Sequence, residues 1–339
     1  MYVSDEDFEK IKRYTVDSGD VCITIVGNIG DVGITPPSLH RASLTENAVK
    51  LVNLRADVDA LFLMYALLSP DAQSQMKLSA AGAAQPKLGI YKVNEIRVPT
   101  PPLPIQRRIA DILSAYDELI ENSQRRIKIL ETMARALYRE WFVHFRFPGH
   151  ESVPRVPSAL GEIPQGWEVK KLFELTKVNY GKTLPTKKLA DDAAYPVYGA
   201  AKIIGRYTEY TREQRTIICG CRGSVGEMQI TQPQCYVTNN SFTFDPTHPD
   251  NYFWLFHTLK ERGLQDVVGG AAQPQITLEG ISSVELATPP LPFRTSFQQA
   301  VLPLFELVWT LDSQIQTLRR TRDLLLPRLL SGQIAVDAA

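Results

Sequence analysis

The pentapeptide GAAQP occurs twice in this chain, at residues 82–86 and again at residues 270–274. The two copies lie 188 residues apart, and at the same spacing TPPLP at 100–104 matches TPPLP at 288–292. Repetition at a fixed spacing indicates that one structural unit has been duplicated. The alignment continues without a gap into the stretch that follows each TPPLP, so the sequence predicts a unit that is built twice.

A repeated glycine motif lies upstream of each copy. TIVGNIGDVGIT at 24–35 faces IICGCRGSVGEMQIT at 217–231. An alignment at a slightly larger spacing places three glycines opposite three others, namely Gly27, Gly30 and Gly33 opposite Gly220, Gly223 and Gly226. The pattern is not the G-x-G-x-x-G of dinucleotide loops, and no Lys-Ser/Thr pair or amphipathic helix follows it. We therefore expect a tight turn between strands in each copy. The alternative is a loop that holds a nucleotide.

Each copy ends in a long stretch with helical periodicity. No Pro or Gly interrupts the chain from Ile105 to about His144. Apolar residues recur there in steps of three and four, a heptad pattern typical of helices that pack on a partner helix. At 1.5 Å per residue, roughly 40 residues would form a rod of about 60 Å, long enough for a spacer.

The expected helix-helix contacts follow from the two heptad patterns. They are Ile109, Ile112, Tyr116, Leu119, Ile127, Leu130 and Leu137 in the first stretch, and Val308, Leu311, Ile315, Leu318 and Leu325 in the second. Pro303 and Pro327 interrupt the second stretch, so we expect continuous helix only between them and a kink or break at Pro327.

The order of segments in each copy is a β-rich unit, a proline-rich hinge and a long helix. The sequence therefore predicts an α+β protein with two β-rich mixed domains joined by two long antiparallel coiled-coil helices, with pseudo-twofold internal symmetry. The predicted segments are a first domain at 1–103, a first spacer helix at 104–147, a second domain at 148–291, a second spacer helix at 292–333 and a C-terminal tail at 334–339.

Composition limits the class of protein. The 339 residues are 44% hydrophobic and 22% charged, with a formal net charge of zero, as expected for a globular protein. No apolar run reaches the length that a membrane span needs, and the start of the chain does not have the form of a signal peptide. We expect a cytoplasmic protein without a membrane partner. The four cysteines lack zinc-ligand spacing, so no metal site is predicted.

The whole chain resembles the specificity subunit of type I restriction-modification enzymes. Three motifs add to the repeat: GEIPQGWE at 161–168, ALYREWFVHF at 136–145 and LLLPRLLSGQI at 324–334. The resemblance implies that each globular unit is a target-recognition domain for one half of a split site in double-stranded DNA, and that the helices fix the distance between the halves.

The resemblance also implies a non-catalytic role for this subunit. In the family, two DNA methyltransferase (modification) subunits that bind S-adenosylmethionine dock on it, and motor-nuclease (restriction) subunits join for cleavage. ATP and magnesium are then expected on those partners, and no cofactor is expected on this chain. Two alternatives are a stand-alone nucleotide-binding enzyme that uses the glycine turns and a purely structural coiled-coil adaptor.

Positive charge is concentrated in one part of the second domain. Residues 170–222 contain eleven basic and five acidic residues, whereas residues 223–291 contain two basic and seven acidic residues. Because phosphate neutralisation provides most DNA affinity and side chains on base edges provide specificity, we expect DNA contacts in the basic half. The candidates are Lys170, Lys171, Lys177, Lys182, Lys187, Lys188, Lys202, Arg206, Arg212, Arg215 and Arg222, with Tyr198, Asn239 and Asn240 for polar base contacts.

The first domain has no counterpart of GEIPQGWE or of the basic stretch after it, which predicts a truncated first domain. Residues 1–103 contain ten basic and twelve acidic residues. We therefore expect that domain to bind DNA weakly or not at all. Gln85 and Gln273, in the repeated phrase, either contact bases or a partner or hold their turn in place. The same glutamine occurs in both domains, although the two domains would read different DNA sequences, and this favours the structural role.

Overall fold

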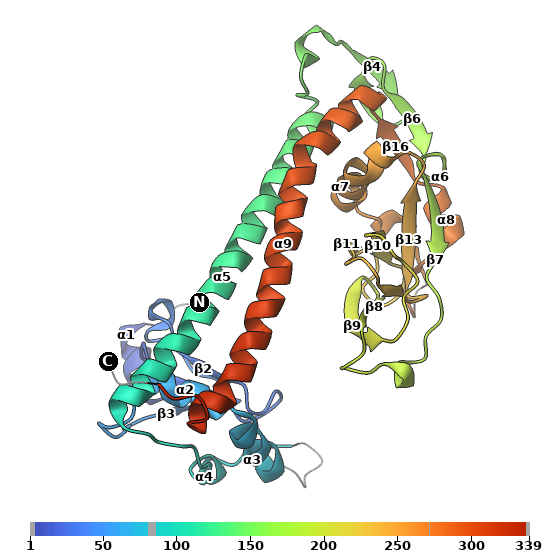
Figure 1. The fold of residues 1–339 in the computed structure, drawn as a ribbon. Helices are drawn as coiled ribbons and strands as arrows, with labels where there is room; N and C mark the ends of the chain where they lie inside the picture. Colours follow the sequence, from blue (N-terminus) through green and yellow to red (C-terminus); the bar gives the residue numbers. More distant parts are fainter. Residues whose placement is uncertain (1–3, 81–85, 271, 337–339) are drawn as a thin grey trace. The chain divides into compact units, whose positions relative to one another are not determined.

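The computed structural model describes residues 4–80, 86–270 and 272–336 of the 339-residue chain. The chain divides into two compact units, of which unit 1 comprises residues 1–126 and 310–339, and unit 2 comprises residues 127–309. The division falls within each of the two long helices, so each unit contains one part of both helices. Figure 1 draws the elements and labels most of them.

Unit 1 is a small antiparallel sheet with short helices. The sheet has the order β2-β1-β3. The strands and helices are α1 (Asp5–Ile11), β1 (Val21–Thr24), β2 (Val32–Ile34), β3 (Ala48–Leu51), α2 (Ala60–Leu68), α3 (Pro70–Ala80) and α4 (Ile90–Val93). The Asp59 carboxylate caps α2 by accepting a hydrogen bond from the Phe62 amide at 3.0 Å. Apolar residues of α2, including Phe62, are buried against the sheet.

Unit 2 contains a larger set of strands. A four-stranded antiparallel sheet has the order β11-β10-β13-β7, and a three-stranded sheet has the order β12-β8-β9. The strands are β4 (Arg155–Ser158), β5 (Gly161–Pro164), β6 (Glu168–Lys171), β7 (Thr176–Tyr180), β8 (Tyr195–Gly199), β9 (Lys202–Tyr207), β10 (Ile217–Gly220), β11 (Met228–Ile230), β12 (Tyr236–Val237), β13 (Ser241–Pro246), β14 (Val268–Gly269), β15 (Gln275–Ile276) and β16 (Glu285–Thr288). The helices are α6 (Leu172–Leu175), α7 (Tyr252–Arg262) and α8 (Leu278–Ser282).

The glycine motif forms a turn between antiparallel strands in both units, as predicted. It joins β1 to β2 in unit 1 and β10 to β11 in unit 2. A nucleotide loop would require a strand, a loop and a helix, so the nucleotide-binding interpretation of this motif is wrong.

The predicted pairing of the glycines is wrong by three residues. Gly27 and Gly30 have φ of +83° and +91°, and the glycines with matching geometry are Gly223 and Gly226, at +78° and +81°. The hydrogen bonds of the two turns match as well. The Ile29 amide donates to the Gly27 carbonyl in unit 1, and the Val225 amide donates to the Gly223 carbonyl in unit 2. Gly220 therefore corresponds to Thr24 and not to Gly27.

The stretch after the repeated pentapeptide is attached to the glycine turn in the same way in both units. In unit 1 the Leu88 amide donates to the Ile25 carbonyl at 2.9 Å, and in unit 2 the Ile276 amide donates to the Cys221 carbonyl at 3.0 Å. Leu88 and Ile276 are 188 residues apart, like the pentapeptides themselves. The described part of the repeated segment thus has a structural role. Gln85 lies outside the described residues.

The two long helices are α5 (Leu103–Tyr138) and α9 (Leu291–Leu330). A π-helical turn at Arg139–Val143 follows α5. The expected break at Pro327 is wrong, because α9 continues through Pro303 and Pro327. Pro327 lacks one backbone hydrogen bond in the last turn of the helix, but the neighbouring Leu326 and Leu329 are buried in the core of unit 1 and hold this turn in place.

In unit 1 the two helices pack in antiparallel directions. Ile109 and Leu113, near the start of α5, share a core with Leu326 and Leu329, near the end of α9. Further along, the Arg322 guanidinium donates to the Asp117 carboxylate. That carboxylate also accepts a hydrogen bond from the Tyr65 hydroxyl at 2.6 Å. The antiparallel pairing that the heptads predict is therefore present.

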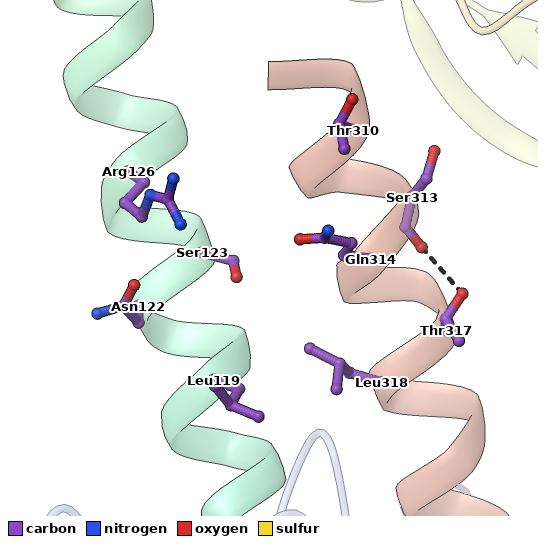
Figure 2. A pocket seen from close by; sticks show the side chains of 9 residues that line it. All are labelled: Leu119, Asn122, Ser123, Arg126, Thr310, Ser313, Gln314, Thr317 and Leu318. Carbon is purple, nitrogen blue, oxygen red and sulfur yellow. Dashed lines mark hydrogen bonds between the residues drawn. The ribbon is translucent and has the colours of Figure 1, made fainter. Parts of the chain in front are cut away.

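The predicted contact of Leu119 is wrong. Leu119 is 55% exposed, whereas the neighbouring Ile120 and Ser123 are buried. Figure 2 shows Leu119 beside a groove of about 670 Å³ between the parts of α5 and α9 that belong to unit 1. Of the other predicted contact residues, Ile109, Val308, Leu311 and Ile315 are buried, and Ile112, Tyr116, Ile127, Leu130, Leu137, Leu318 and Leu325 are partly buried.

In unit 2 the helices meet through aromatic side chains. Phe142, from ALYREWFVHF, packs edge-on against Phe297 of α9 with ring centroids 5.0 Å apart. Tyr138 contacts the same ring at 6.1 Å, and Trp167 of GEIPQGWE lies 6.0 Å from Phe142. ALYREWFVHF and GEIPQGWE thus contribute aromatic residues to the core of unit 2, where aromatic packing adds to simple burial.

The glycine turn of unit 2 leads to a stability prediction. A Cβ atom on Gly220 would lie 2.1 Å from the Ser224 carbonyl oxygen, whereas a Cβ atom on Gly269 would have no neighbour within 4 Å. We expect Gly220→Ala to lower the free energy of unfolding by about 1–3 kcal/mol, and Gly269→Ala to change it little. Urea unfolding measures both, and equal midpoints for the two variants would contradict the tight turn.

Candidate nucleic-acid interface

Three loops of unit 2 meet at one edge of the sheets, here called the loop edge. They are residues 181–183, the glycine turn at 221–227 and the turn at Asn239–Asn240. The Lys182 amide donates to the Val237 carbonyl at 2.9 Å, and the Cys221 amide donates to the Asn240 carbonyl at 2.9 Å. Main-chain hydrogen bonds therefore hold the three loops against one another.

Gly181 allows these loops to approach closely. A Cβ atom at this position would lie 2.3 Å from the Thr238 carbonyl oxygen and 2.4 Å from the Val237 carbonyl oxygen. The β8–β9 turn reaches the same edge, because the Ala201 amide donates to the Ser241 hydroxyl at 3.1 Å. Ala200 and Ala201 both have left-handed φ values, of 51° and 62°, which produce this sharp turn.

Cationic and amide side chains gather at the loop edge. Lys182, Lys202, Arg222 and Asn240 are exposed there, and Asn239 is partly buried. The Lys202 ammonium lies 3.3 Å from the Glu227 carboxylate of the glycine turn, and both groups are largely exposed. An exposed pair of this kind contributes little to stability, so its lysine can exchange the carboxylate for a phosphate at small cost.

Arg222 links the loop edge to the repeated segment. Its Nε donates to the Gln275 Oε1 at 3.2 Å. In unit 1 the corresponding bridge joins Val26 and Lys87. Each unit thus has one cationic residue at this position, an arginine on the turn in unit 2 and a lysine on the opposing segment in unit 1.

A comparison with known families decides the class of protein. The model of the type I restriction modification DNA specificity domain matches residues 2–132 and 164–301, which is more than half of the chain. The chain belongs to the type I DNA specificity family. The two matched segments reflect the duplicated unit that the pentapeptide and the glycine turns indicate. The α+β fold class with two long helices, predicted from the sequence, is confirmed.

Individual members of the specificity family are distant in sequence. The type I restriction enzyme MjaIX specificity subunit of Methanocaldococcus jannaschii is 25% identical, over 94% of this chain and 78% of its own. The HindI specificity subunit of Haemophilus influenzae is 24% identical, over 80% of this chain and 77% of its own. A crystal structure of the type I restriction-modification system S subunit from M. genitalium matches the fold with a TM-score of 0.57 at 18% identity, covering 94% of this chain and 84% of that one.

Other predicted contact residues lie outside the three loops that form the loop edge. Lys187 and Lys188 lie in a 3-10 turn at Thr186–Lys188. Arg206 lies on β9, and its guanidinium donates to the carbonyls of Ala193 and Ala194. Lys170 and Lys171 lie on β6, and Lys177 lies opposite Asp245 on the neighbouring strand. The structure thus separates the eleven predicted cations into groups and does not form one patch from them.

Tyr198 is wrongly predicted as a base-contacting residue. Tyr198 is 1% exposed, and its hydroxyl accepts a hydrogen bond from the backbone N–H of Gln232 at 3.0 Å. Two predicted arginines also have internal partners. Arg212 forms an ion pair with Asp245 at 2.8 Å and bonds Thr243, and Arg215 lies over the Trp309 ring at 4.1 Å. These side chains are already engaged in holding strands and helices together.

The sequence reasoning missed Gln275, the residue that positions the Arg222 guanidinium. It immediately follows the repeated pentapeptide, and the repeat itself was the signal that could have identified it. Gln273 lies in the turn before it, where its carbonyl oxygen closely approaches Gly270.

No helix in the described ranges 4–80, 86–270 and 272–336 is both long and apolar enough to cross a membrane.

The buried position of Tyr198 can be tested by removing its hydroxyl. We expect Tyr198→Phe to lower the free energy of unfolding by about 1 kcal/mol, because the hydrogen bond from Gln232 is lost. The affinity for DNA should not change, because the ring is buried. Chemical denaturation and fluorescence anisotropy with a labelled duplex measure the two quantities. A weakened DNA complex with unchanged stability would restore the base-contact interpretation.

Proposed function

We propose that this chain is the DNA-recognition subunit of a type I restriction-modification complex and that it reads a two-part target in double-stranded DNA. The observation that supports this is the duplicated framework, in which each unit attaches the same glycine turn to the same repeated segment. Each unit would read one half of the target. The two long helices, which contribute to both units, would set the separation of the halves.

In unit 2 the loop edge has the chemistry that DNA binding requires. The ammonium groups of Lys182 and Lys202 and the Arg222 guanidinium can neutralise backbone phosphates. The amides of Asn239 and Asn240 both donate and accept hydrogen bonds, so they can recognise base edges in the major groove. Sheet hydrogen bonds fix the loops that hold these groups, which reduces the entropy lost on binding.

Unit 2 would provide the larger share of the affinity. In unit 2, β6 pairs with β16, but the corresponding residues 97–100 of unit 1 are not in a strand. The described part of unit 1 also has no counterpart of β7, β8 or β9, the strands that flank the basic segment of unit 2. With ten basic and twelve acidic residues, 1–103 offers DNA no excess of positive charge.

The same proposal includes a scaffold role. DNA methyltransferase subunits carrying S-adenosylmethionine and motor-nuclease subunits using ATP and magnesium would perform the chemistry on DNA. This chain would contribute recognition and placement. Its relatives are specificity subunits of type I restriction enzymes, and this supports the assignment of catalysis to other chains.

The loop edge is tested by charge reversal in the full-length chain. We expect Lys182→Glu and Arg222→Glu each to weaken DNA binding by about tenfold or more at 0.1 M salt, and to reduce the slope of log K against log salt by roughly one. Lys171→Glu is the matched control, because it makes the same charge change in the same unit away from the loop edge. Fluorescence anisotropy at several salt concentrations measures all three variants.

Two results would count against the loop edge as the interface. If Lys171→Glu weakened binding as much as Lys182→Glu, the basic residues would act only through their summed charge. If the unaltered chain had no salt-dependent affinity for DNA, alone or with its partner subunits, the structural adaptor would become the better interpretation.

The scaffold role predicts what accompanies the chain in its host. Affinity purification of the tagged chain should recover a DNA methyltransferase subunit at about twice its copy number. Quantitative mass spectrometry measures the ratio, and an unrelated tagged protein serves as the control. Recovery of the chain without any methyltransferase would contradict this part of the proposal.

A further inference from the structure

Unit 2 contains a cavity that is not part of the loop edge. It lies between α5, α7 and α9 and has a volume of about 360 Å³, within the range of small-molecule sites. We refer to it as the α7 cavity. Its lining residues are Lys128, Glu131, Thr132, Arg135, Phe256, His257, Lys260 and Phe305.

The α7 cavity lies where unit 1 has a salt bridge. At the 188-residue spacing of the repeat, Ala134 corresponds to Arg322 and Phe305 corresponds to Asp117. In unit 1 the Arg322 guanidinium donates to the Asp117 carboxylate, which also accepts from the Tyr65 hydroxyl. In unit 2 the side chain of Ala134 is a single buried methyl group. Phe305, at the position of Asp117, is a buried aromatic ring that lines the cavity, so the salt bridge of unit 1 has no counterpart in unit 2.

Tyr65, which hydrogen-bonds to Asp117 in unit 1, also has a counterpart in unit 2. Tyr65 is the sixth residue of α2, and His257 is the sixth residue of α7. The His257 ring is 5% exposed and stacks on Tyr138 with centroids 5.5 Å apart. Its Nε2 has no hydrogen-bond partner among the described residues. Burial, together with the charge of Lys260, lowers the pKa of His257 to about 3, so the ring is neutral at physiological pH.

The walls of the cavity are aromatic and its rim is cationic. Phe256 and Phe305 are 6% exposed each, and their rings contact the imidazole and each other, with centroids 5.2–6.2 Å apart. On the rim, Arg135 is paired with Glu261 at 3.0 Å. Within the part of the chain that the structure describes, neither Lys128 nor Lys260 has a carboxylate within ion-pair distance.

We propose that the α7 cavity binds a small aromatic monoanion. The ring of the ligand would lie against Phe256 and Phe305, and its carboxylate or sulfonate would be reached by Lys128 and Lys260. Glu131, on the same rim, disfavours ligands with several negative charges, such as a nucleic-acid backbone. This inference does not depend on the DNA-binding role, because none of these residues belongs to the loop edge.

The fluorescent aryl sulfonate anilinonaphthalene sulfonate tests the site in the full-length chain. We expect saturable binding with one probe per chain and a blue-shifted emission. The double variant Lys128→Glu with Lys260→Glu should bind about tenfold more weakly, equivalent to about 1.4 kcal/mol. Thr132→Trp should abolish binding by filling the cavity from its exposed side, with little risk to folding. Lys171→Glu, on β6, is the control and should leave binding unchanged.

Competition identifies the natural form of the ligand. Phenylacetate represents a free metabolite, and a tetrapeptide with a C-terminal phenylalanine represents a chain end from a partner protein. The competitor that displaces the probe at the lower concentration identifies the source. The Hε1 resonance of His257 should shift on binding of either competitor. Probe binding that does not saturate, or that survives Thr132→Trp and the double lysine variant, would overturn the proposal.

Discussion

Each long helix of this protein can bury its apolar face only against a segment that is far away in sequence. In unit 1, Leu113 near the start of α5 shares a core with Leu326 near the end of α9. In unit 2, Phe142 after the end of α5 packs against Phe297 near the start of α9. Both units depend on this antiparallel pairing. In each unit, residues of the strands and of the long helices share one core, and burial of apolar surface is the main stabilising term in folding.

Duplication explains why so much of the architecture can be predicted from the sequence. GAAQP and TPPLP repeat at one spacing, and the structure uses the segments after GAAQP in the same way, through the Leu88 and Ile276 amides. The turn character of the glycine motif also follows from the sequence, because it lacks the residues of a phosphate loop. The pairing of its glycines does not follow, since insertions between the motifs allow two alignments and only φ angles and hydrogen bonds distinguish them.

The errors in the candidate interface have a common physical cause. Composition shows where positive charge is abundant, but it does not show which charges are balanced inside the fold. Arg212 is matched by Asp245 on a neighbouring strand, and Tyr198 is enclosed by the β8–β9 and β10–β13 region. The loop edge, in contrast, is defined by close main-chain approaches at Gly181 and Gly220, which no count of lysines and arginines could reveal. The heptad pattern has a similar limit, because it does not show how closely two helices approach: Leu119 lines the groove between α5 and α9 and is 55% exposed.

The use of both ends of the chain in one core has a consequence for synthesis. The core of unit 1 contains Val21 and Ile23 from β1 and also Leu326 and Leu329 from the end of α9. Domains generally fold as they emerge from the ribosome, in order from the N-terminus. Unit 1 emerges first, yet its core cannot close until the last helix has been translated. During elongation its sheet exposes to solvent the apolar surface that Leu326 and Leu329 later cover.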